Sequence, residues 1–264
     1  MDLQLKGKTA LITGSTAGIG LATAKLLAKE GASVIINGRT QQRIDNAINE
    51  IKSEVKSAAI NGVTADFSKT DEVYALIKQI PAIDILINNV AIFEPKPFVE
   101  IPDEDWMKFY EVNVLSGIRL SRYYFPLMLK KNWGRIIFIS SESALNIPEE
   151  MIHYGMTKTA QLAVSRGLAQ LTKGTHVTVN AVLPGPTKSE GVGGFIDQMA
   201  KQENKSTEAT EKDFFQTARP TSILQRFTST EEIANLIAYV ASPLSSATNG
   251  AALKADGGVA RYII

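Results

Sequence analysis

Short apolar segments alternate with longer amphipathic segments along the whole chain. Most of the short segments carry aliphatic or β-branched residues on both faces, which is typical of strands buried in a parallel sheet. The predicted strands cover residues 9–12, 33–37, 60–65, 83–87, 135–140, 175–182 and 251–254. The segments between them have helical spacing over residues 20–30, 42–56, 70–80, 103–130, 154–171 and 230–241.

Strand–helix alternation of this kind implies right-handed parallel crossovers. The predicted fold is therefore α/β, a Rossmann-type doubly wound parallel sheet of about seven strands with helices on both faces. With 264 residues, the chain fits one domain over 1–264. Only residues 188–225 depart from the alternation of predicted strands and helices, because this stretch is glycine-rich at its start and polar afterwards. Long irregular segments in compact domains are often functional, so we expect a lid.

Composition narrows the class of partner. Hydrophobic residues make up 44%, charged residues 21%, and the formal net charge is +1 with no block of like charge. This balance favours a small-molecule partner over nucleic acid or a membrane surface. Without cysteine, and with only His153 and His176, the chain does not support a disulfide or a metal site. We expect a cytoplasmic protein, since no signal peptide or membrane span is visible.

A glycine-rich turn follows the first predicted strand directly. It reads Thr-Gly-Ser-Thr-Ala-Gly-Ile-Gly over residues 13–20 and opens the first predicted helix. Glycines let the backbone approach a pyrophosphate closely, and the helix N-terminus offers free N–H groups and positive potential. The placement at a strand–helix junction, more than the glycines themselves, predicts a dinucleotide site.

The end of the second predicted strand bears on the choice of dinucleotide. An acid there would bind the adenosine ribose and repel a 2′-phosphate. The chain instead has Asn37, Gly38 and Arg39, and a guanidinium can bind a phosphate through two N–H groups. We therefore predict NADP, with NAD as the less favoured cofactor. Asp66, at the end of the third strand, is placed to meet the adenine amino group or to cap a helix.

Three residues suggest the chemistry. Tyr154 and Lys158 lie four residues apart, so a helix puts the phenol and the ammonium on one face. A free tyrosine has a pKa near 10, and a neighbouring cation lowers it. Ser141 ends the fifth predicted strand, and the carboxyl ends of parallel strands face the ligand crevice. The spacing of all three predicts an acid/base tyrosine beside a substrate-binding hydroxyl.

Together these features resemble the short-chain dehydrogenase/reductase family, in its single-domain branch and near the 3-oxoacyl-acyl-carrier-protein reductases. The resemblance covers essentially the whole chain. It rests on the turn at 13–20, Asp66, the Asn-Asn-Val-Ala run at 88–91, Asn113, Ser141, the Tyr-Gly-Met-Thr-Lys motif at 154–158, and Asn180 with Pro184 and Gly185.

The resemblance implies a single NAD(P)-binding domain and a catalytic tetrad of Asn113, Ser141, Tyr154 and Lys158. Tyrosine exchanges the substrate oxygen's proton while hydride passes at the nicotinamide C4. Serine positions that oxygen, lysine binds the nicotinamide ribose and lowers the tyrosine pKa, and asparagine holds a relay water. The implied cofactor-binding residues are Gly14, Ser15, Thr16, Gly18, Ile19, Gly20, Arg39, Asp66, Phe67, Asn89, Tyr154, Lys158, Pro184, Gly185, and Thr187 or Ser189 for the carboxamide.

Two departures from the family pattern bear on cofactor fit. The family commonly has Ala-Gly where this chain has Val90-Ala91 beside the adenosine ribose. Many NADP-using members carry a basic residue at the position of Ala17, so the NADP prediction depends on Arg39.

Three alternatives compete with a general carbonyl reductase or alcohol dehydrogenase. A 3-oxoacyl-acyl-carrier-protein reductase would have arginines at the positions of Asn132 and Thr175 to dock the carrier protein. A non-catalytic cofactor-binding regulator typically lacks the tyrosine or the lysine. An enoyl reductase has a wider spacing than Tyr154 and Lys158 show.

The substrate, a small carbonyl or alcohol compound, is the least determined point. Apolar side chains at Phe93, Ile147, Phe195, Met199, Phe214 and Phe215 are candidates for the pocket wall. Glu142, Glu149 and Glu150 would disfavour anionic substrates if they lie near the cleft. The resemblance also implies a homotetramer or homodimer assembled through helices 103–130 and 154–171.

Overall fold

A seven-stranded parallel sheet forms the centre of the protein, in the order β3-β2-β1-β4-β5-β6-β7. The structure is a computed structural model that describes residues 2–263, apart from the side chain of Phe195. The strands are β1 (Thr9–Ile12), β2 (Ser33–Gly38), β3 (Ile60–Thr64), β4 (Ile85–Asn88), β5 (Gly134–Ile139), β6 (Val177–Pro184) and β7 (Ala252–Ala255). The predicted Rossmann-type sheet is confirmed, with strand ends differing from the prediction by a few residues.

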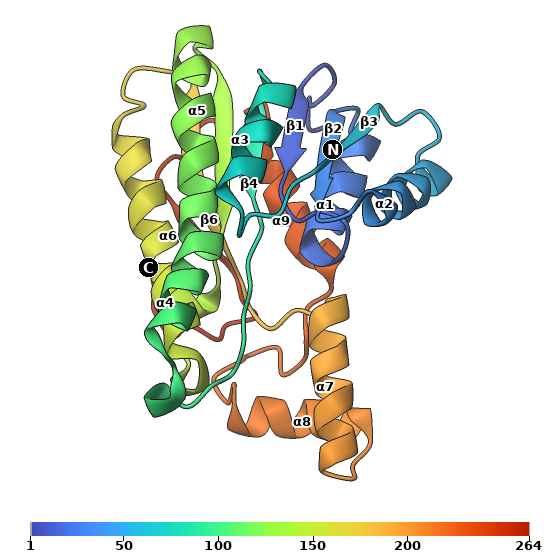
Figure 1. The fold of residues 1–264 in the computed structure, drawn as a ribbon, viewed down its shortest axis with the longest axis vertical. Coiled ribbons are helices and arrows are strands. Elements are labelled where there is room, and N and C mark those ends of the chain that lie inside the picture. The colour runs from blue at the N-terminus through green and yellow to red at the C-terminus, as the bar shows by residue number, and fades with distance from the viewer. Residues whose placement is uncertain (1, 264) are drawn as a thin grey trace.

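Helices cover both faces of this sheet (Figure 1). They are α1 (Gly18–Lys29), α2 (Gln41–Glu54), α3 (Thr70–Gln79), α4 (Asp103–Tyr110), α5 (Ser116–Lys131), α6 (Ile152–Gln170), α7 (Glu190–Gln202), α8 (Thr207–Thr217) and α9 (Thr230–Ala241). One buried cluster joins α1, α2 and α9 to the sheet, and a second joins α3, α5 and α6 to its other face. Neither face is solvated, as the two-sided apolar strands predict. Within residues 2–263, no helix has the length and apolar character to cross a bilayer.

The strand order reverses between β1 and β4. The chain leaves β1 toward β2 and β3 on one side and returns to β4 on the other side. Crossover connections that run in opposite directions from two neighbouring strands leave a crevice at their carboxyl ends. The glycine-rich turn follows β1 and the Asn-Asn-Val-Ala run closes β4, so both motifs meet at this crevice.

The predicted helix over 103–130 is not one regular helix. A π-helical turn at Glu111–Leu115 separates α4 from α5. Such a turn accommodates one extra residue and re-aims the neighbouring side chains, and it frequently occurs at functional sites. Here it contains Asn113, which is fully buried.

The predicted lid segment contains two helices that the sequence pattern did not reveal. Helices α7 and α8 lie beyond the carboxyl ends of the strands, below the body of the domain in Figure 1. Each begins at a serine whose hydroxyl accepts a backbone N–H, Ser189 for α7 and Ser206 for α8. They pack around a small cluster of their own, made by Ile196, Phe215 and Phe227.

Candidate active site

Two asparagines on either side of β1, one in β2 and one just after β4, hold the glycine-rich turn. Asn37 Oδ1 accepts the backbone N–H of Gly14 at 3.0 Å. Asn89 Nδ2 donates to the carbonyl oxygens of Thr13 (2.9 Å) and Gly14 (3.0 Å). Gly14 has a φ of +59°, and a Cβ there would lie 2.9 Å from Val90 Cγ2. The turn therefore needs glycine at this position.

A cavity of about 750 Å³ opens beside this turn, at the carboxyl ends of β1, β2 and β3. Its lining includes the predicted residues Gly14, Thr16, Gly18, Ile19, Arg39, Asp66, Phe67, Asn89 and Ser189. Ser15 and Gly20 do not line it. Ser15 is buried beneath the turn, where its hydroxyl donates to the carbonyl oxygen of Ile12 at 2.7 Å. A Cβ at Gly20 would lie 2.6 Å from Asn89 Nδ2, so this glycine permits close packing of helix on turn.

A second guanidinium, which the sequence reading did not select, reaches the same cavity. Arg43 lines it together with Arg39. The two lie on either side of Thr40, whose hydroxyl accepts the backbone N–H of Arg43 at the start of α2. The available signal was that Arg43 lies in the first turn of the helix that follows the end of β2.

Asp66 lines the cavity as an anion. Partial burial works against its ionisation, but hydrogen bonds from Ser68, and the charges of Lys69 and Arg39, hold the pKa of its carboxyl below its usual value. Ser68 donates both its N–H (2.9 Å) and its hydroxyl (2.8 Å) to Asp66 Oδ1. Asp66 is not the N-cap of α3, since Lys69 occupies that position.

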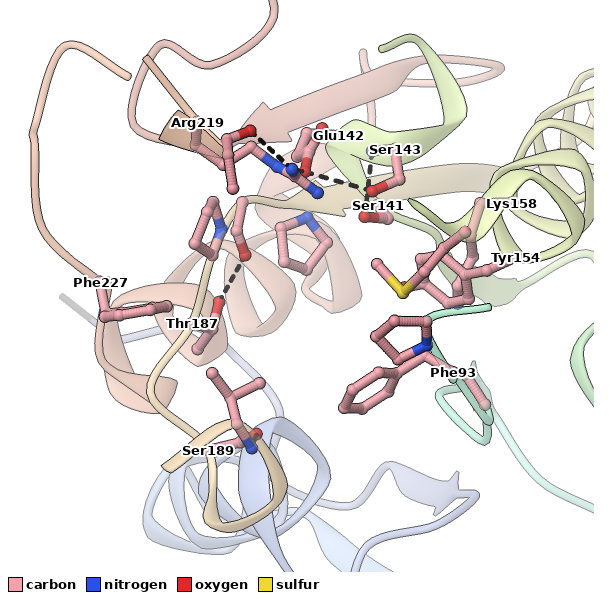
Figure 2. A pocket seen from close by; sticks show the side chains of 18 of the residues that line it. Phe93, Ser141, Glu142, Ser143, Tyr154, Lys158, Thr187, Ser189, Arg219 and Phe227 are labelled. Carbon is pink, nitrogen blue, oxygen red and sulfur yellow. Dashed lines mark hydrogen bonds and ion pairs between the residues drawn. The ribbon is translucent and has the colours of Figure 1, made fainter. Parts of the chain in front are cut away.

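A second cavity of about 560 Å³ adjoins the first, and Ile19, Asn89, Ala91 and Ser189 line both. Ser141, Tyr154 and Lys158 line this second cavity. Figure 2 shows Tyr154 and Lys158 beside Ser141. Three of the four residues of the predicted tetrad therefore meet at one cavity, next to the cavity beside the glycine-rich turn.

Hydrogen bonds between β5 and α6 bring these groups together. The Ser140 hydroxyl donates to the carbonyl oxygen of Lys158 at 2.9 Å. The Thr159 hydroxyl donates to the carbonyl oxygen of Ala144 at 2.8 Å. A Cβ at Gly155 would lie 2.8 Å from Ile147 Cγ2, so the glycine next to Tyr154 allows this approach. Ile147 acts here as a packing partner and does not line the cavity.

Ser141 is arranged to donate a hydrogen bond into the cavity. Its Oγ accepts the backbone N–H of Ser143 at 3.1 Å. The Ser141 hydroxyl also interacts with the Tyr154 phenol and lowers its pKa. Ser141 therefore stands beside the phenol at the cavity, where its hydroxyl can meet a bound oxygen.

Burial shifts the acid/base pair in opposite directions. It raises the pKa of Tyr154 to about 12, against a lowering by the Ser141 hydroxyl. It lowers the pKa of Lys158 to about 7. Lys158 Nζ donates to the carbonyl oxygen of Ile139 at 2.9 Å and lies 5.5 Å from the centroid of the Tyr154 ring. Lys158 is not among the groups that shift the pKa of Tyr154.

Asn113 lies behind the cavity rather than on its wall. Its Oδ1 accepts the N–H of Ile92 (2.8 Å), and its Nδ2 donates to the carbonyl oxygen of Ile92 and to the hydroxyl of Thr157, each at 3.0 Å. Its side chain therefore ties the segment after β4 to α6. Gln161, which the sequence reading missed, donates to the main-chain carbonyl of Asn113 and lies 3.5 Å from Lys158 Nζ. In the sequence, the signal for Gln161 was its position three residues after Lys158, on the same face of the helix.

The segment after β6 forms the wall opposite Tyr154. Pro184, Gly185, Thr187 and Ser189 all line the cavity. The Thr187 hydroxyl donates to the carbonyl oxygen of Gly185 at 2.9 Å and lies 3.0 Å from the Thr228 hydroxyl. The Ser189 hydroxyl accepts the N–H of Val192. Both hydroxyls thus support the backbone here, and the choice between them for a carboxamide stays open.

Apolar side chains cover the remainder of the cavity. Phe93, Met199 and Phe214 line it, as predicted, together with Phe227. The Phe93 ring meets Tyr154 edge to face at a centroid distance of 6.4 Å. Phe215 instead packs inside the lid cluster, and the side chain of Phe195 lies outside the described residues.

A buried ion pair completes the wall and was not foreseen. Arg219, just after α8, donates from Nε to Glu142 Oε1 at 2.9 Å and from Nη1 to Glu150 Oε1 at 3.2 Å. Burial raises the pKa of Glu142, and Arg219 opposes that rise. Glu142 and Arg219 stand 77 residues apart in the chain, so no local pattern could have paired them. The pair fastens the lid to the end of β5.

Comparison with known proteins agrees with this geometry. The family model for the short chain dehydrogenases matches residues 8–200. An uncharacterized oxidoreductase of Bacillus subtilis, YvaG, is 48% identical over 263 residues and covers all of both chains. The 3-oxoacyl-[acyl-carrier-protein] reductase FabG of Aquifex aeolicus is 31% identical over 263 residues, covering 98% of this chain and all of that one.

Among solved structures, the L-sorbose reductase of Gluconobacter frateurii in complex with NADPH and L-sorbose superposes with a TM-score of 0.92. It is 27% identical and covers all of both chains. The chain belongs to the short-chain dehydrogenase/reductase family, whose members are NAD(P)-dependent oxidoreductases. The resemblance predicted from the motifs is thereby confirmed.

Proposed function

We propose that the protein is an NADP-preferring carbonyl reductase or alcohol dehydrogenase, with Tyr154 as its acid/base. The observation that carries the proposal is the meeting of Tyr154, Ser141 and Lys158 in a cavity that adjoins a dinucleotide-sized cavity. A bound nicotinamide cofactor would supply or accept the hydride. The glycine-rich turn, the two guanidiniums and Asp66 supply backbone N–H groups, cations and an acceptor that fit such a cofactor.

The chain's own residues would handle the proton. Ser141 would donate a hydrogen bond from its hydroxyl to the substrate oxygen and stabilise negative charge there. Tyr154 gives its phenolic proton to that oxygen during reduction and takes it back during oxidation. Lys158 would bind the ribose hydroxyls of the cofactor, and its positive charge would favour the tyrosinate. Asn113 and Gln161 hold α6, and with it Lys158, in place.

The NADP preference rests on Arg39, just after β2, and on Arg43, in the first turn of α2. Arg39→Ala should weaken NADPH binding about 10- to 100-fold, because it removes a charge-assisted hydrogen bond to a phosphate. NADH binding should change less than about threefold, since NADH lacks that phosphate. Fluorescence titration with each cofactor measures both changes. Arg122→Ala, an arginine on α5 outside both cavities, is the control. Equal losses for the two cofactors would overturn the preference.

A direct test of the function is turnover. The purified protein is titrated with NADPH and NADH, and oxidation of the tighter one is followed with a panel of ketones and aldehydes. We expect oxidation of NADPH with at least one member of the panel. Binding without turnover on any carbonyl compound would favour the non-catalytic regulator.

The carrier-protein reductase remains a narrower alternative, favoured by the similarity to the Aquifex aeolicus enzyme. Asn132 and Thr175, where that subgroup would have arginines, serve local structure in this chain. Asn132 has a φ of +56° at the end of α5, and its Oδ1 accepts the N–H of His176 at 3.1 Å. We therefore propose a small carbonyl or alcohol as substrate. The family resemblance supports a dimer or tetramer assembled through the segment from α4 to α5 and through α6.

A further inference from the structure

A third cavity, of about 230 Å³, lies at the end of the sheet opposite to the active site. The first residues of β5 and β6 line it, together with the segment that follows α9. Ser141 and Pro184 lie at the carboxyl ends of the same two strands, so the length of the sheet separates this cavity from the active site. We call it the Arg135 cavity, after the only arginine on its wall.

Arg135 is a buried cation that backbone carbonyls hold in place. Its side chain is only 2% exposed. Nε donates to the carbonyl oxygen of Ser242 at 3.1 Å, and Nη1 donates to those of Gly134 (3.0 Å) and His176 (2.9 Å). These bonds join the starts of β5 and β6 to the end of α9. They use three of the five N–H groups of a guanidinium.

The remaining two N–H groups, both on Nη2, are accessible. Nη2 has no acceptor among residues 2–263, but it is not one of the unpartnered polar atoms that are sealed from solvent. Because Arg135 lines the cavity, these N–H groups are available to a ligand there. A role in holding the strand ends explains Nε and Nη1 and leaves Nη2 without a function.

The charge of Arg135 has no carboxylate partner. Burial lowers the pKa of the guanidinium to about 10, and no acidic group of residues 2–263 opposes that shift. The group therefore stays cationic at neutral pH. Its Cζ lies 4.7 Å from the centroid of the Trp133 ring, and Lys8 Nζ lies 3.8 Å from the same centroid. Two cations thus gather at Trp133, where a buried charge without a counter-ion is unfavourable.

Exposed polar side chains complete the wall. His176 and Ser246 line the cavity, and their side chains form no hydrogen bond with residues 2–263. A hydroxyl and an imidazole can each donate to a bound oxygen. Asn249 is fixed instead, since its Oδ1 accepts the N–H of Val179 (2.9 Å) and its Nδ2 donates to the Thr172 hydroxyl (2.7 Å). The cavity therefore offers free donors from several elements on a wall that is held in place.

We propose that the Arg135 cavity binds a phosphate group, as inorganic phosphate or as a small phosphomonoester. A phosphate presents several acceptor oxygens to donors that come from different elements, whereas a carboxylate presents only two. Its negative charge would neutralise the buried guanidinium. A bound phosphate would join the starts of β5 and β6 to the segment after α9 without contact with the active site. The inference goes beyond the proposed function and does not depend on it.

Isothermal titration calorimetry of the NADPH-saturated protein with inorganic phosphate tests the site. The cofactor is there to fill the cavity that Arg39 and Arg43 line, so that phosphate is left with the Arg135 cavity. We expect about one phosphate per chain with a Kd of about 1 mM or below, and acetate at least about tenfold weaker. Arg39→Ala without NADPH should bind phosphate equally well. Glycerol 1-phosphate distinguishes the two ligands, because an ester that fits the cavity binds at least as tightly as free phosphate.

Ser246→Asp is the decisive variant. It places a carboxylate on the cavity wall from an exposed position, so it repels phosphate without disturbing the core. Phosphate binding should weaken at least about tenfold, while turnover stays unchanged. Ser57→Asp makes the same change of charge at an exposed serine between α2 and β3, outside the cavity, and should bind phosphate normally. Arg135→Met should abolish binding, with circular dichroism as the check that this variant folds.

Three outcomes would overturn the inference. One is the lack of saturable phosphate binding by the unsubstituted protein. Another is a phosphate affinity that Ser246→Asp and Ser57→Asp change to the same extent. The third is binding that disappears in Arg39→Ala, because phosphate would then occupy the cavity beside the glycine-rich turn. Each leaves the proposed function standing, and a protein without turnover that binds phosphate as described would defeat only the proposed function.

Discussion

Tyr154→Phe should lower kcat by about 1,000-fold or more with any carbonyl substrate while leaving the affinity for NADPH within about threefold. The substitution removes only the phenolic proton donor, and a positioned general acid contributes roughly 10²- to 10⁴-fold. The ring remains to pack against Phe93. Steady-state kinetics give kcat, and fluorescence titration gives the cofactor affinity.

Tyr74→Phe is the matched control, because it removes a phenolic hydroxyl from an exposed side chain of α3 that lines neither cavity. It should retain full activity. Turnover by Tyr154→Phe within about tenfold of the unsubstituted protein would show that another group moves the proton.

Lys158→Met should also lower kcat/KM, by about 100-fold or more, and it should change how stability depends on pH. The lysine has a pKa of about 7 in the folded protein, against 10.5 for a free side chain. Between these values the unfolded chain holds a proton that the folded chain releases, so stability rises with pH. The free-energy cost of burying the charged lysine is present in full below the pKa of the folded state. It is absent above the pKa of the unfolded chain.

The expected contribution of Lys158 is a rise of up to about 1.4 kcal/mol per pH unit within that window. Urea unfolding of the cofactor-free protein at several pH values measures it, and Lys158→Met should lack this rise. Lys130→Met, which removes an exposed lysine of α5, should keep it. If the free energy of unfolding changes with pH in the same way in the unsubstituted protein and in Lys158→Met, Lys158 is not desolvated in the folded state.

Local features of the sequence predicted the sheet and the centre of the site. The glycine turn sits at a strand–helix junction, and Tyr154 and Lys158 share one helix, so chain distance alone fixes their relation. Right-handed βαβ crossovers then place helices on both faces of the sheet. These features need no knowledge of distant contacts, and the structure has them as predicted.

The features that escaped prediction depend on contacts between distant segments or on weak local patterns. Helices α7 and α8 are rich in polar residues and glycine, and only a few side chains such as Ile196 and Phe215 anchor them. Arg219 meets Glu142 because the lid folds back on β5. Asn113 is buried because it lies in a π-turn. No single residue type predicts such a turn.

That π-turn has a consequence for how the chain tolerates insertions and deletions. Each helical residue advances about 100° around the axis, so removing one residue from Glu111–Leu115 would convert α4 and α5 into one regular helix and rotate one half against the other by that amount. Either Asn113 would turn away from Ile92 and Thr157, or Leu120, Tyr124 and Met128 would turn away from the sheet. The π-turn thus sets the rotation of α5, which packs on the core, relative to α4 and the site. The protein should therefore tolerate insertions and deletions in this turn far less well than insertions and deletions in the lid.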